Sequence, residues 1–375
     1  MTTGVAILGS TGSIGTSTIR VIQRQSHRFR VVALTAFGSE ELLREQATML
    51  GVDFVGLVDG GGGVPTGSCV GRGCLVEAAT RADADIVVNA VVGAAGLEAT
   101  IAALRAGKRV ALANKESLVM AGEIVLEAAR SGGGRLVPVD SEHSAVLQCI
   151  HGRPEVEVRK LILTASGGPF REWPRERLAE ATVEHALRHP TWQMGPKITV
   201  DSATLANKAL EVIEAHHLFG LGYDAIEVVV HPQSIVHAFT EFVDGSVLAQ
   251  VGYPSMELPI LYALTYPERI DDDEVRRFDP IEAGPLTFER VRSEDFPTFA
   301  LGVDAGRAGG TAPAVFNAAN EVAVSRFLEG RLAFGRIPMT IEGVLGRHTI
   351  VPASDMETVM EADRWARSEA EASCS

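Results

Sequence analysis

The stretch Val5-Ala6-Ile7-Leu8-Gly9-Ser10-Thr11-Gly12-Ser13-Ile14-Gly15 decides the fold of the first part of this chain. Its apolar start, residues 5–8, predicts a buried strand, and the apolar positions that recur from Ile14 onward predict a helix. A strand, a glycine-rich turn and a helix in this order form the nucleotide-binding corner of doubly wound α/β sheets, because glycine lets the backbone approach a pyrophosphate. The spacing is G-x-x-G-x-x-G, so an ordinary tight turn is the alternative interpretation.

The residues after the second expected strand bear on which dinucleotide binds. This strand is expected over 29–34, and Thr35-Ala36-Phe37-Gly38-Ser39 follows it. NAD sites usually carry an acid here for the ribose 2′-hydroxyl, whereas the first acid in this chain, Glu40, is expected to open a helix behind Ser39. The missing acid favours NADP, and the candidate contacts for its 2′-phosphate are Ser39 and Arg44.

Strands and helices continue to alternate through the first third of the chain. Strands are expected over 54–58, 85–92 and 109–113, a surface loop over 59–73 and a helix over 99–106. This alternation predicts a doubly wound parallel sheet whose ligand lies at the carboxyl ends of the strands. Lys115 follows one of these ends, where a solvated lysine and a lysine near the substrate are equally good interpretations.

Two carboxylates follow the next expected strand. In Val137-Pro138-Val139-Asp140-Ser141-Glu142-His143, one residue separates Asp140 from Glu142. Residues two apart in an extended or turning segment project to the same side, so both carboxylates can meet one hard divalent cation. Solvated acids at the end of a strand are the alternative.

A small-residue turn and a proline-bounded loop come next. The apolar stretch 161–170 runs from a strand into Ser166-Gly167-Gly168, where backbone N–H groups and a hydroxyl suit phosphate oxygens. The loop 188–196 contains Trp192 and Met194, which either belong to the core or form a lid that excludes water.

The helical stretch 199–218 carries the second group of polar residues. Asn207 and Glu211 are four apart and Lys208 and Glu211 three apart, so all three lie on one face of the helix. Asn207 and Lys208 can hold a phosphate together with Ser202, while Glu211 can reach the cation of the acidic pair. The alternative is an ion pair on the surface of the helix.

The remainder of the chain predicts an α+β part and a helical end. The strands expected at 228–230, 236–243 and 246–251 are predicted to be antiparallel, and His231 and His237 to make structural hydrogen bonds. The predicted domains are an N-terminal Rossmann-like doubly wound parallel sheet over 1–139, an α+β catalytic domain over 140–266, a linker over 267–298 and a C-terminal helical domain over 299–375.

Composition excludes some partners. The chain has 375 residues and a net charge of −14, which argues against a nucleic acid or an anionic membrane as partner. The strand that starts at Val5 leaves no room for a signal peptide, and the longest apolar run, 86–97, is too short to span a bilayer. The four cysteines lack zinc-ligand spacing, so we expect a cytoplasmic protein with reduced thiols.

Nearly the whole chain resembles the 1-deoxy-D-xylulose 5-phosphate reductoisomerase family through several motifs in the same order. These are ILGSTGSIG at 7–15, VGAAGL at 92–97, LANKESLV at 112–119, VDSEHSA at 139–145, ASGGPF at 165–170, HPTWQMG at 189–195, VDSATLANKALEVIEA at 200–215, HPQSIVH at 231–237 and NAANE at 317–321. The chain departs from the family after the second strand, where Phe37-Gly38-Ser39 replaces a common Gly-Lys/Arg pair.

The resemblance implies a role for each set of residues. Metal ligands are implied at Asp140, Glu142 and Glu211, with Lys115 as a further catalytic residue. Substrate contacts are implied at Ser141, Ser166, His189, Trp192, Ser202, Asn207 and Lys208, and a flexible lid at His189, Trp192 and Met194. Cofactor contacts are implied at Gly9, Ser10, Thr11, Gly12, Ser13, Ile14, Gly38, Ser39, Asn114 and Glu116.

The resemblance also implies a reaction. It is the isomerisation and reduction of 1-deoxy-D-xylulose 5-phosphate to 2-C-methyl-D-erythritol 4-phosphate, with NADPH and Mg²⁺, Mn²⁺ or Co²⁺, in non-mevalonate isoprenoid biosynthesis and in a homodimer. Two alternatives stay open. A simple NADP-dependent dehydrogenase would leave the carboxylate cluster unused, and a sensor would bind nucleotide and sugar phosphate without catalysis.

Overall fold

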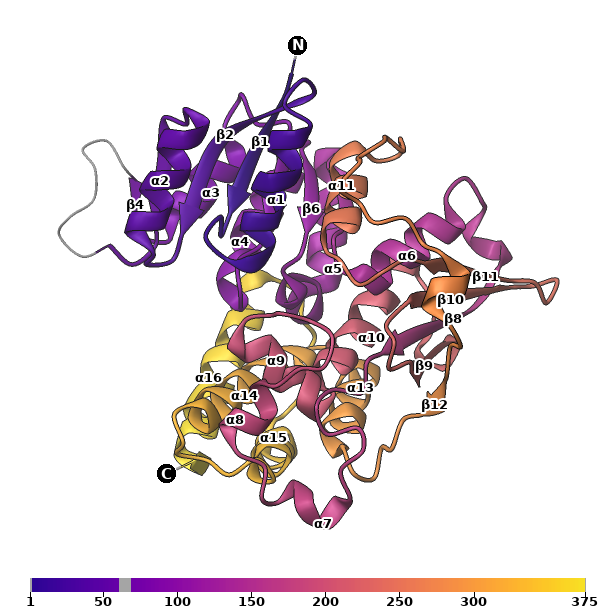
Figure 1. Ribbon diagram of the computed structural model, residues 1–375. Coiled ribbons are helices and arrows are strands. Elements are labelled where there is room, and N and C mark those ends of the chain that lie inside the picture. The colour runs from indigo at the N-terminus through magenta and orange to yellow at the C-terminus, as the bar shows by residue number, and fades with distance from the viewer. Residues whose placement is uncertain (1, 61–68, 375) are drawn as a thin grey trace. The chain divides into compact units, whose positions relative to one another are not determined.

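The structure is a computed structural model that describes residues 2–60 and 69–374 (Figure 1). Part of the loop expected over 59–73 lies outside the described residues, and its described end contains strand β4, Cys69–Val70. Packing contacts divide the chain into two compact units. Unit 1 comprises Met1–Ser117, Glu123–Leu147 and Ser255–Arg276, and unit 2 comprises Leu118–Gly122, Gln148–Pro254 and Arg277–Ser375.

Unit 1 is built on a seven-stranded sheet of order β4-β3-β2-β1-β5-β6-β7, in which all neighbouring strands are parallel. The other strands are β1 (Thr3–Leu8), β2 (Phe29–Ala36), β3 (Phe54–Leu57), β5 (Ile86–Asn89), β6 (Arg109–Leu112) and β7 (Arg135–Pro138). Its helices are α1 (Ser13–Arg24), α2 (Glu40–Leu50), α3 (Gly73–Thr80), α4 (Leu97–Arg105), most of α5 (Lys115–Gly132), the start of α6 (Ser141–Ile150) and α11 (Glu257–Thr265).

The strand order places β1 at the point where the sheet reverses its direction of growth, between β2 and β5. Dinucleotides bind outside the carboxyl ends of strands at such a switch point. The apolar residues 5–8 of β1 are all 0% exposed, as expected of a central strand that is covered on both faces. The predicted Rossmann-like parallel sheet is confirmed.

Residues 255–276 pack within unit 1. Helix α11 packs against α1, and Arg24 of α1 binds Glu257 at 2.7 Å and Asp272 at 2.9 Å. The sequence places the start of this segment in the second domain and the rest in a linker. The apolar face of α11 also enters the core of unit 1, where Ile260, Leu261 and Leu264 are buried. The sequence could not predict this packing because its partners lie far away in the chain.

Unit 2 contains a five-stranded sheet of order β11-β10-β8-β9-β12. Its strands are β8 (Val158–Ala165), β9 (Ile226–Val230), β10 (Val236–Phe242), β11 (Val247–Val251) and β12 (Glu289–Arg290). The predicted antiparallel hairpin of β10 and β11 is confirmed. The antiparallel prediction is wrong for β9 on one side, because β9 pairs in parallel with β8 and only its other edge pairs antiparallel with β12.

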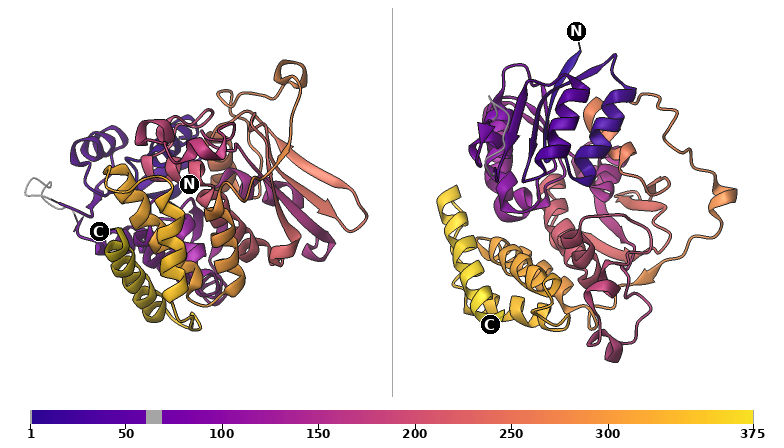
Figure 2. Two further views of the ribbon diagram at one scale, coloured as in Figure 1. Left: turned by 90° about the horizontal axis from the view of Figure 1, so that it is seen from below. Right: turned by 60° about the vertical axis from the view of Figure 1, so that its left-hand side comes forward.

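Helices make up the rest of unit 2. They are α7 (Arg175–Leu178), α8 (Val183–Leu187), α9 (Pro196–Thr204), α10 (Ala206–Phe219), α12 (Pro280–Ala283), α13 (Pro297–Ala308), α14 (Ala312–Leu328), α15 (Arg336–Arg347) and α16 (Met356–Cys374). The last three lie side by side in both views of Figure 2, with α14 packed on α15 and α16. The predicted helical carboxyl-terminal region is confirmed, and its core includes the fully buried Phe316.

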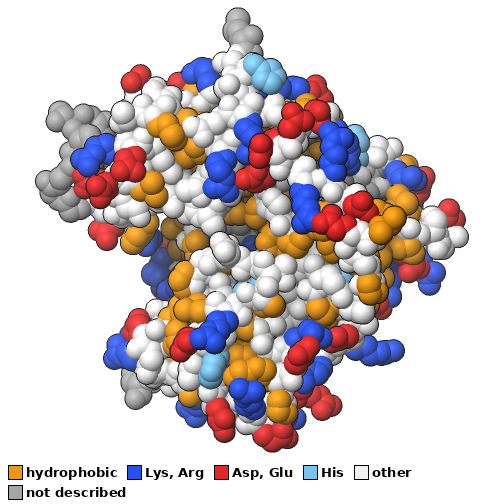
Figure 3. Space-filling model, in the orientation of Figure 1, with side chains coloured by type: hydrophobic (Ala, Val, Ile, Leu, Met, Phe, Trp, Pro, Cys, Tyr) orange, Lys and Arg blue, Asp and Glu red, His pale blue; other side chains and the backbone are white. Residues whose placement is uncertain are grey.

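The surface carries charges of both signs. On the face seen in Figure 3, lysine and arginine side chains alternate with aspartate and glutamate over unit 1 and unit 2. Among the described residues, no helix combines the length and the apolar character needed to cross a membrane.

Candidate active site

The turn between β1 and α1 brings the backbone close to the switch point of the sheet. Gly9 has a φ of 81°, a left-handed conformation that glycine adopts without strain. A Cβ atom on Gly15 would lie 2.3 Å from the carbonyl oxygen of Gly9 and 2.5 Å from Cα of Ser10. Helix α1 can therefore start directly on the turn because residue 15 has no side chain.

The exposed side of this turn is suited to binding an anion. Residues 11–14 are exposed or half-buried, and Gly12 precedes the twelve-residue helix α1 without a side chain to cover its first N–H groups. Ser10 lies deeper: it is 0% exposed, and its Oγ donates to Oε1 of Gln46 at 2.7 Å. Ser10 thus anchors the turn: its backbone N–H donates to the carbonyl oxygen of Thr35 at 2.8 Å, and its carbonyl oxygen accepts from Nε2 of Gln46 at 3.0 Å.

The segment after β2 lies at the same edge of the sheet. Phe37 is 71% exposed, and Gly38 and Ser39 are exposed before α2 begins at Glu40. Ser39 is the N-cap residue of α2, yet its side chain makes no capping hydrogen bond within the described part of the chain. A hydroxyl in place of an acid at this position is compatible with a 2′-phosphate.

Asn114 makes hydrogen bonds that fix the loop after β5, at the same edge of the sheet. Its Nδ2 donates to the carbonyl oxygens of Val91 at 2.8 Å and Gly93 at 2.9 Å, and to the carboxylate of Glu116. Its Oδ1 accepts from the backbone N–H of Ser117, so Asn114 caps α5. Asn114 and Glu116 are 1% and 5% exposed. The hydrogen bonds of Asn114 therefore hold the loop after β5 from its buried side.

The acidic pair occupies the start of a helix. Asp140 follows β7 and accepts the backbone N–H of Glu142 at 3.1 Å on its Oδ1, so it caps α6. The sequence-based geometry allowed an extended or a turning segment, and the structure has the turning one, because Glu142 lies in the first turn of α6. The consequence is the same, since the two carboxylates offer oxygens within 4.8 Å of each other.

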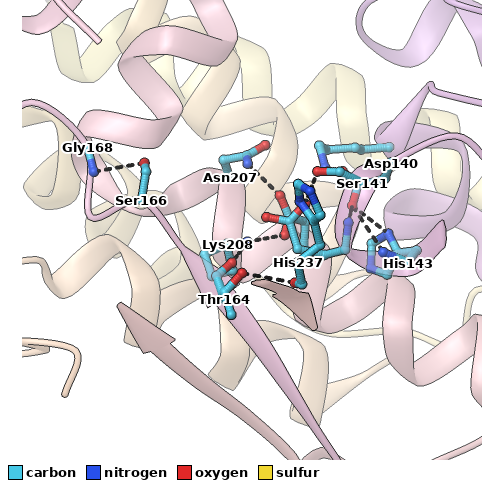
Figure 4. Close-up of polar contacts among 12 residues, drawn as sticks. Asp140, Ser141, His143, Thr164, Ser166, Gly168, Asn207, Lys208 and His237 are labelled. Carbon is cyan, nitrogen blue, oxygen red and sulfur yellow. Dashed lines mark hydrogen bonds and ion pairs between the residues drawn. The ribbon is translucent and has the colours of Figure 1, made fainter. Parts of the chain in front are cut away.

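Lys115 and His143 both contact the carboxylate of Asp140. Nζ of Lys115 donates to Oδ2 of Asp140. Nδ1 of His143 lies 3.2 Å from Oδ1 of the same carboxylate, and Figure 4 labels both His143 and Asp140. Ser141 donates its hydroxyl to Glu142. Lys115 is 7% exposed, which excludes the solvated-lysine alternative. Sequence reasoning did not identify His143 as a residue of this site. Its position three residues after Asp140 could have indicated the contact, because residues three apart at the start of a helix are neighbours.

Unit 2 holds a second buried charge cluster on α10. Lys208 and Glu211 form an ion pair and are 4% and 1% exposed, so the surface-pair alternative is excluded. Lys208 also donates to the backbone carbonyl of Thr164, and Asn207 donates to Glu211, as Figure 4 shows. The predicted shared face of Asn207, Lys208 and Glu211 is confirmed by these contacts.

A hydroxyl and a glycine turn lie at the end of β8 in the same unit. Gly167 and Gly168 have φ values of 83° and 66°, and the N–H of Gly168 donates to Oγ of Ser166 at 3.2 Å. A Cβ atom on Gly168 would lie 2.6 Å from the carbonyl oxygen of Ser202. The turn therefore lies directly against the end of α9, which brings Ser166 and Ser202 into the same neighbourhood.

His189 connects the proline-bounded loop to this turn. Its Nδ1 accepts the backbone N–H groups of Thr191 at 3.1 Å and Trp192 at 2.9 Å. In the neutral ring the proton then resides on Nε2, which lies 2.9 Å from Oγ of Ser166 and donates to it. The half-buried Trp192 lies 6.4 Å from the ring of His237, and the lid role of this loop stays a prediction.

Burial lowers the pKa of His189 from 6.5 to about 4. A histidine with a depressed folded-state pKa contributes stability above its unfolded-state pKa and loses it as the pH falls through the folded value. We therefore expect the free energy of unfolding to fall less between pH 6.5 and 4 in His189→Gln than in the wild type. Urea denaturation at a series of pH values measures this, with the exposed His27→Gln as control. Equal pH dependence in the wild type and His189→Gln would contradict it.

Together these features define a class of protein. It is an α/β dinucleotide-binding enzyme with a capped carboxylate pair and a lysine at the strand ends of unit 1, and a buried lysine–glutamate pair beside a glycine turn in unit 2. Family comparisons narrow this class. A model described as 1-deoxy-D-xylulose 5-phosphate reductoisomerase matches residues 5–122, and models of the carboxyl-terminal domains of the same enzyme match 136–219 and 251–369. The chain belongs to the 1-deoxy-D-xylulose 5-phosphate reductoisomerase family.

Individual relatives agree along the whole chain. The chain is 49% identical to the 1-deoxy-D-xylulose 5-phosphate reductoisomerase of Gloeobacter violaceus, with 97% of this chain and 95% of that protein covered. It is 50% identical to the protein of the same name from Symbiobacterium thermophilum, with 98% and 97% covered.

Solved structures share the fold. The enzyme of Zymomonas mobilis, solved in complex with NADPH, matches with a TM-score of 0.91 and 41% identity over 99% of both chains. A DOX-P reductoisomerase in complex with NADPH, fosmidomycin and magnesium matches with a TM-score of 0.95 and 39% identity over 99% of this chain and 98% of that chain.

Proposed function

We propose that this protein converts 1-deoxy-D-xylulose 5-phosphate to 2-C-methyl-D-erythritol 4-phosphate, using NADPH and a divalent cation. The observation that carries the proposal is the carboxylate pair of Asp140 and Glu142 at the strand ends of a dinucleotide-binding sheet. A simple dehydrogenase has no use for such a pair, whereas a reaction that rearranges a carbon skeleton needs charge stabilisation there. Family membership over nearly the full length supports the same substrate.

We propose Asp140, Glu142 and Glu211 as the ligands of the cation. Three carboxylates form a donor set for hard cations such as Mg²⁺, which prefer oxygen ligands and retain some water molecules. Mg²⁺ is bound by a solved relative, and Mn²⁺ and Co²⁺ are the other candidates. Lys115 and His143 hold the carboxylate of Asp140 and orient it, a supporting arrangement typical of metal sites.

The glycine turn of β1 and α1 fits NADPH. Residues 9 to 14 would hold the pyrophosphate, and Gly38 and Ser39 the adenosine side, while Asn114 and Glu116 position the loop behind it. When bound, NADPH supplies the hydride and the cation supplies a Lewis acid for neighbouring substrate oxygens. The contribution of this chain is to place the nucleotide turn at the switch point after β1 and the carboxylate pair of Asp140 and Glu142 after β7, at the carboxyl ends of strands of the same sheet.

Unit 2 supplies the contacts for the substrate phosphate. The hydroxyls of Ser166 and Ser202, the amide of Asn207 and the ammonium of Lys208 are groups that bind phosphate oxygens. His189 donates from Nε2 to Ser166 and so orients its hydroxyl, and the indole of Trp192 belongs to the loop that would exclude water. Holding the phosphate at a distance from the reacting carbons contributes binding energy that positions them.

Replacing Gly15 with alanine is expected to lower both stability and NADPH affinity, because its Cβ would meet backbone atoms at 2.3 and 2.5 Å. We expect a loss of about 1–3 kcal/mol in the free energy of unfolding, as for other overpacked sites. Gly12→Ala is the matched variant: its Cβ would only touch Gly9 at 3.5 Å, so it should weaken NADPH binding with a smaller loss of stability, that of alanine as N-cap residue of α1. Fluorescence titration with NADPH and urea denaturation separate the two effects. An unchanged unfolding curve for Gly15→Ala would contradict the prediction.

We further propose a homodimer that acts in the cytoplasm. Strand β11 lies at one end of the unit 2 sheet and has apolar side chains that are partly exposed, Val247, Leu248 and Val251. An edge strand of this kind favours pairing with another chain.

One assay tests the function. The protein is mixed with NADPH, Mn²⁺ and 1-deoxy-D-xylulose 5-phosphate, and the absorbance of the reduced nicotinamide is followed. We expect oxidation that depends on both the cation and this substrate. Oxidation with an ordinary ketone alone would indicate a simple dehydrogenase, and binding without turnover would indicate a sensor.

A further inference from the structure

A separate cavity lies in unit 1, at the edge of the sheet opposite the glycine turn. Its volume is about 530 Å³, within the range of small-molecule sites. It is lined by residues at or next to the amino ends of β1, β2, β5, β6 and β7 and by the segment 264–268. The nucleotide turn follows the carboxyl end of β1, so this cavity is not part of that site.

Three guanidinium groups line the cavity, from Arg28, Arg109 and Arg135. Arg28 forms an ion pair with Glu268 at 2.5 Å. Arg109 donates to the backbone carbonyl of Leu264 at 2.7 Å, and the guanidinium of Arg135 lies 5.6 Å from the ring centre of Tyr266. Within the described residues, neither Arg109 nor Arg135 forms an ion pair with a carboxylate.

These two arginines lie directly opposite each other on neighbouring strands. Arg109 is the register partner of Arg135 in the parallel pair of β6 and β7. Like charges in opposite positions of a sheet destabilise it. Burial is the main cause that lowers the pKa of Arg109, and the charge of Arg135 lowers it further, while Tyr266 and Glu268 offset part of this effect.

The acids that line the cavity are already engaged. Asp85 accepts the backbone N–H of Gly4 at 2.8 Å, and Glu268 is paired with Arg28. Three arginines and two carboxylates line the cavity, so its lining carries a net positive charge, although the protein carries a net charge of −14. Paired guanidinium groups bind phosphate oxygens in forked, bidentate geometry.

We propose that this cavity binds a small anion that bears a phosphate or diphosphate group, held by Arg109 and Arg135. The anion would neutralise two like charges that the folded chain brings together, and the ring of Tyr266 would cover one side of it. The site is independent of the proposed reaction, because none of its residues belongs to the cofactor, metal or substrate sets.

Calorimetric titration of the full chain with inorganic pyrophosphate, without divalent cations, tests the proposal. Arg135→Glu should weaken binding at this cavity by at least about tenfold, because the new carboxylate pairs with Arg109. Its melting temperature should stay the same or rise for the same reason. Arg130→Glu is the matched control: it makes the same charge change on exposed α5, outside the cavity, and should bind as the wild type does.

Two further variants make the result decisive. Arg135→Ala removes the charge without adding a new partner, and it should lose the same binding event even if the glutamate variant folds poorly. Lys208→Gln removes a proposed substrate phosphate contact and the ion pair with Glu211, and neither residue lines the cavity, so the event that depends on Arg135 should persist in it. Binding unchanged in both Arg135 variants, or abolished entirely by Lys208→Gln, would overturn the proposal.

Discussion

Asparagine in place of Asp140 is expected to lower kcat by about 10²–10³-fold, the effect of removing one strong electrostatic contact from an active site. Asn and Asp are equally good N-cap residues, so the hydrogen bond to the N–H of Glu142 and the start of α6 should survive the change. The variant removes the negative charge that Lys115 and His143 both contact. Steady-state assays at saturating NADPH and cation measure the loss.

The control for this variant is Asp279→Asn. Asp279 caps α12 through the same two kinds of backbone contact, at 2.8 Å to Ile281 and 3.2 Å to Glu282, and belongs to no proposed site. It should retain wild-type kcat. A kcat for Asp140→Asn close to that of the control would show that the charge of Asp140 plays no part in the reaction.

Glutamine in place of Glu211 is expected to lower kcat by a similar factor and to raise the concentration of Mg²⁺ needed for half-maximal rate. It should also destabilise the protein, because Lys208 would remain as a buried cation that has lost the carboxylate of its ion pair. Breaking a buried pair in this way typically costs about 3–5 kcal/mol. Thermal unfolding without cation measures this second effect.

Glu127→Gln provides the comparison for Glu211→Gln. Glu127 is exposed on α5 and pairs with Arg130 in a solvated ion pair, which is worth little. It should leave both kcat and the Mg²⁺ requirement unchanged. If Glu211→Gln lost stability but kept its Mg²⁺ requirement, Glu211 would be a structural partner of Lys208 and not a ligand.

The parts of the fold that the sequence predicts well depend on local periodicity. The apolar run 5–8 with the glycines after it predicted β1 and its turn, because strand burial and glycine conformation are properties of neighbouring residues. The contacts among Asn207, Lys208 and Glu211 followed from helical spacing alone. Helical spacing did not predict that this cluster is buried, because burial depends on elements far away in the chain.

Long-range pairing accounts for what could not be predicted. The parallel pairing of β9 with β8 depends on the long connection through α7–α10. The packing of 255–276 within unit 1 depends on apolar residues of α11 that join a core formed by distant strands and on ion pairs with Arg24. At the site itself, Asp140 proved to be a helix cap, and the two carboxylates come close through the first turn of α6. The spacing of two residues was informative because it allowed a turning segment as well as an extended one.

The central claim is our proposal that Asp140, Glu142 and Glu211 are ligands of one cation. Binding of Mn²⁺ to the protein alone, followed by electron paramagnetic resonance, tests it most directly. We expect one Mn²⁺ per chain, with binding weakened at least about tenfold in Asp140→Asn, Glu142→Gln and Glu211→Gln alike and unchanged in Glu127→Gln. Wild-type affinity in Glu211→Gln would contradict the claim.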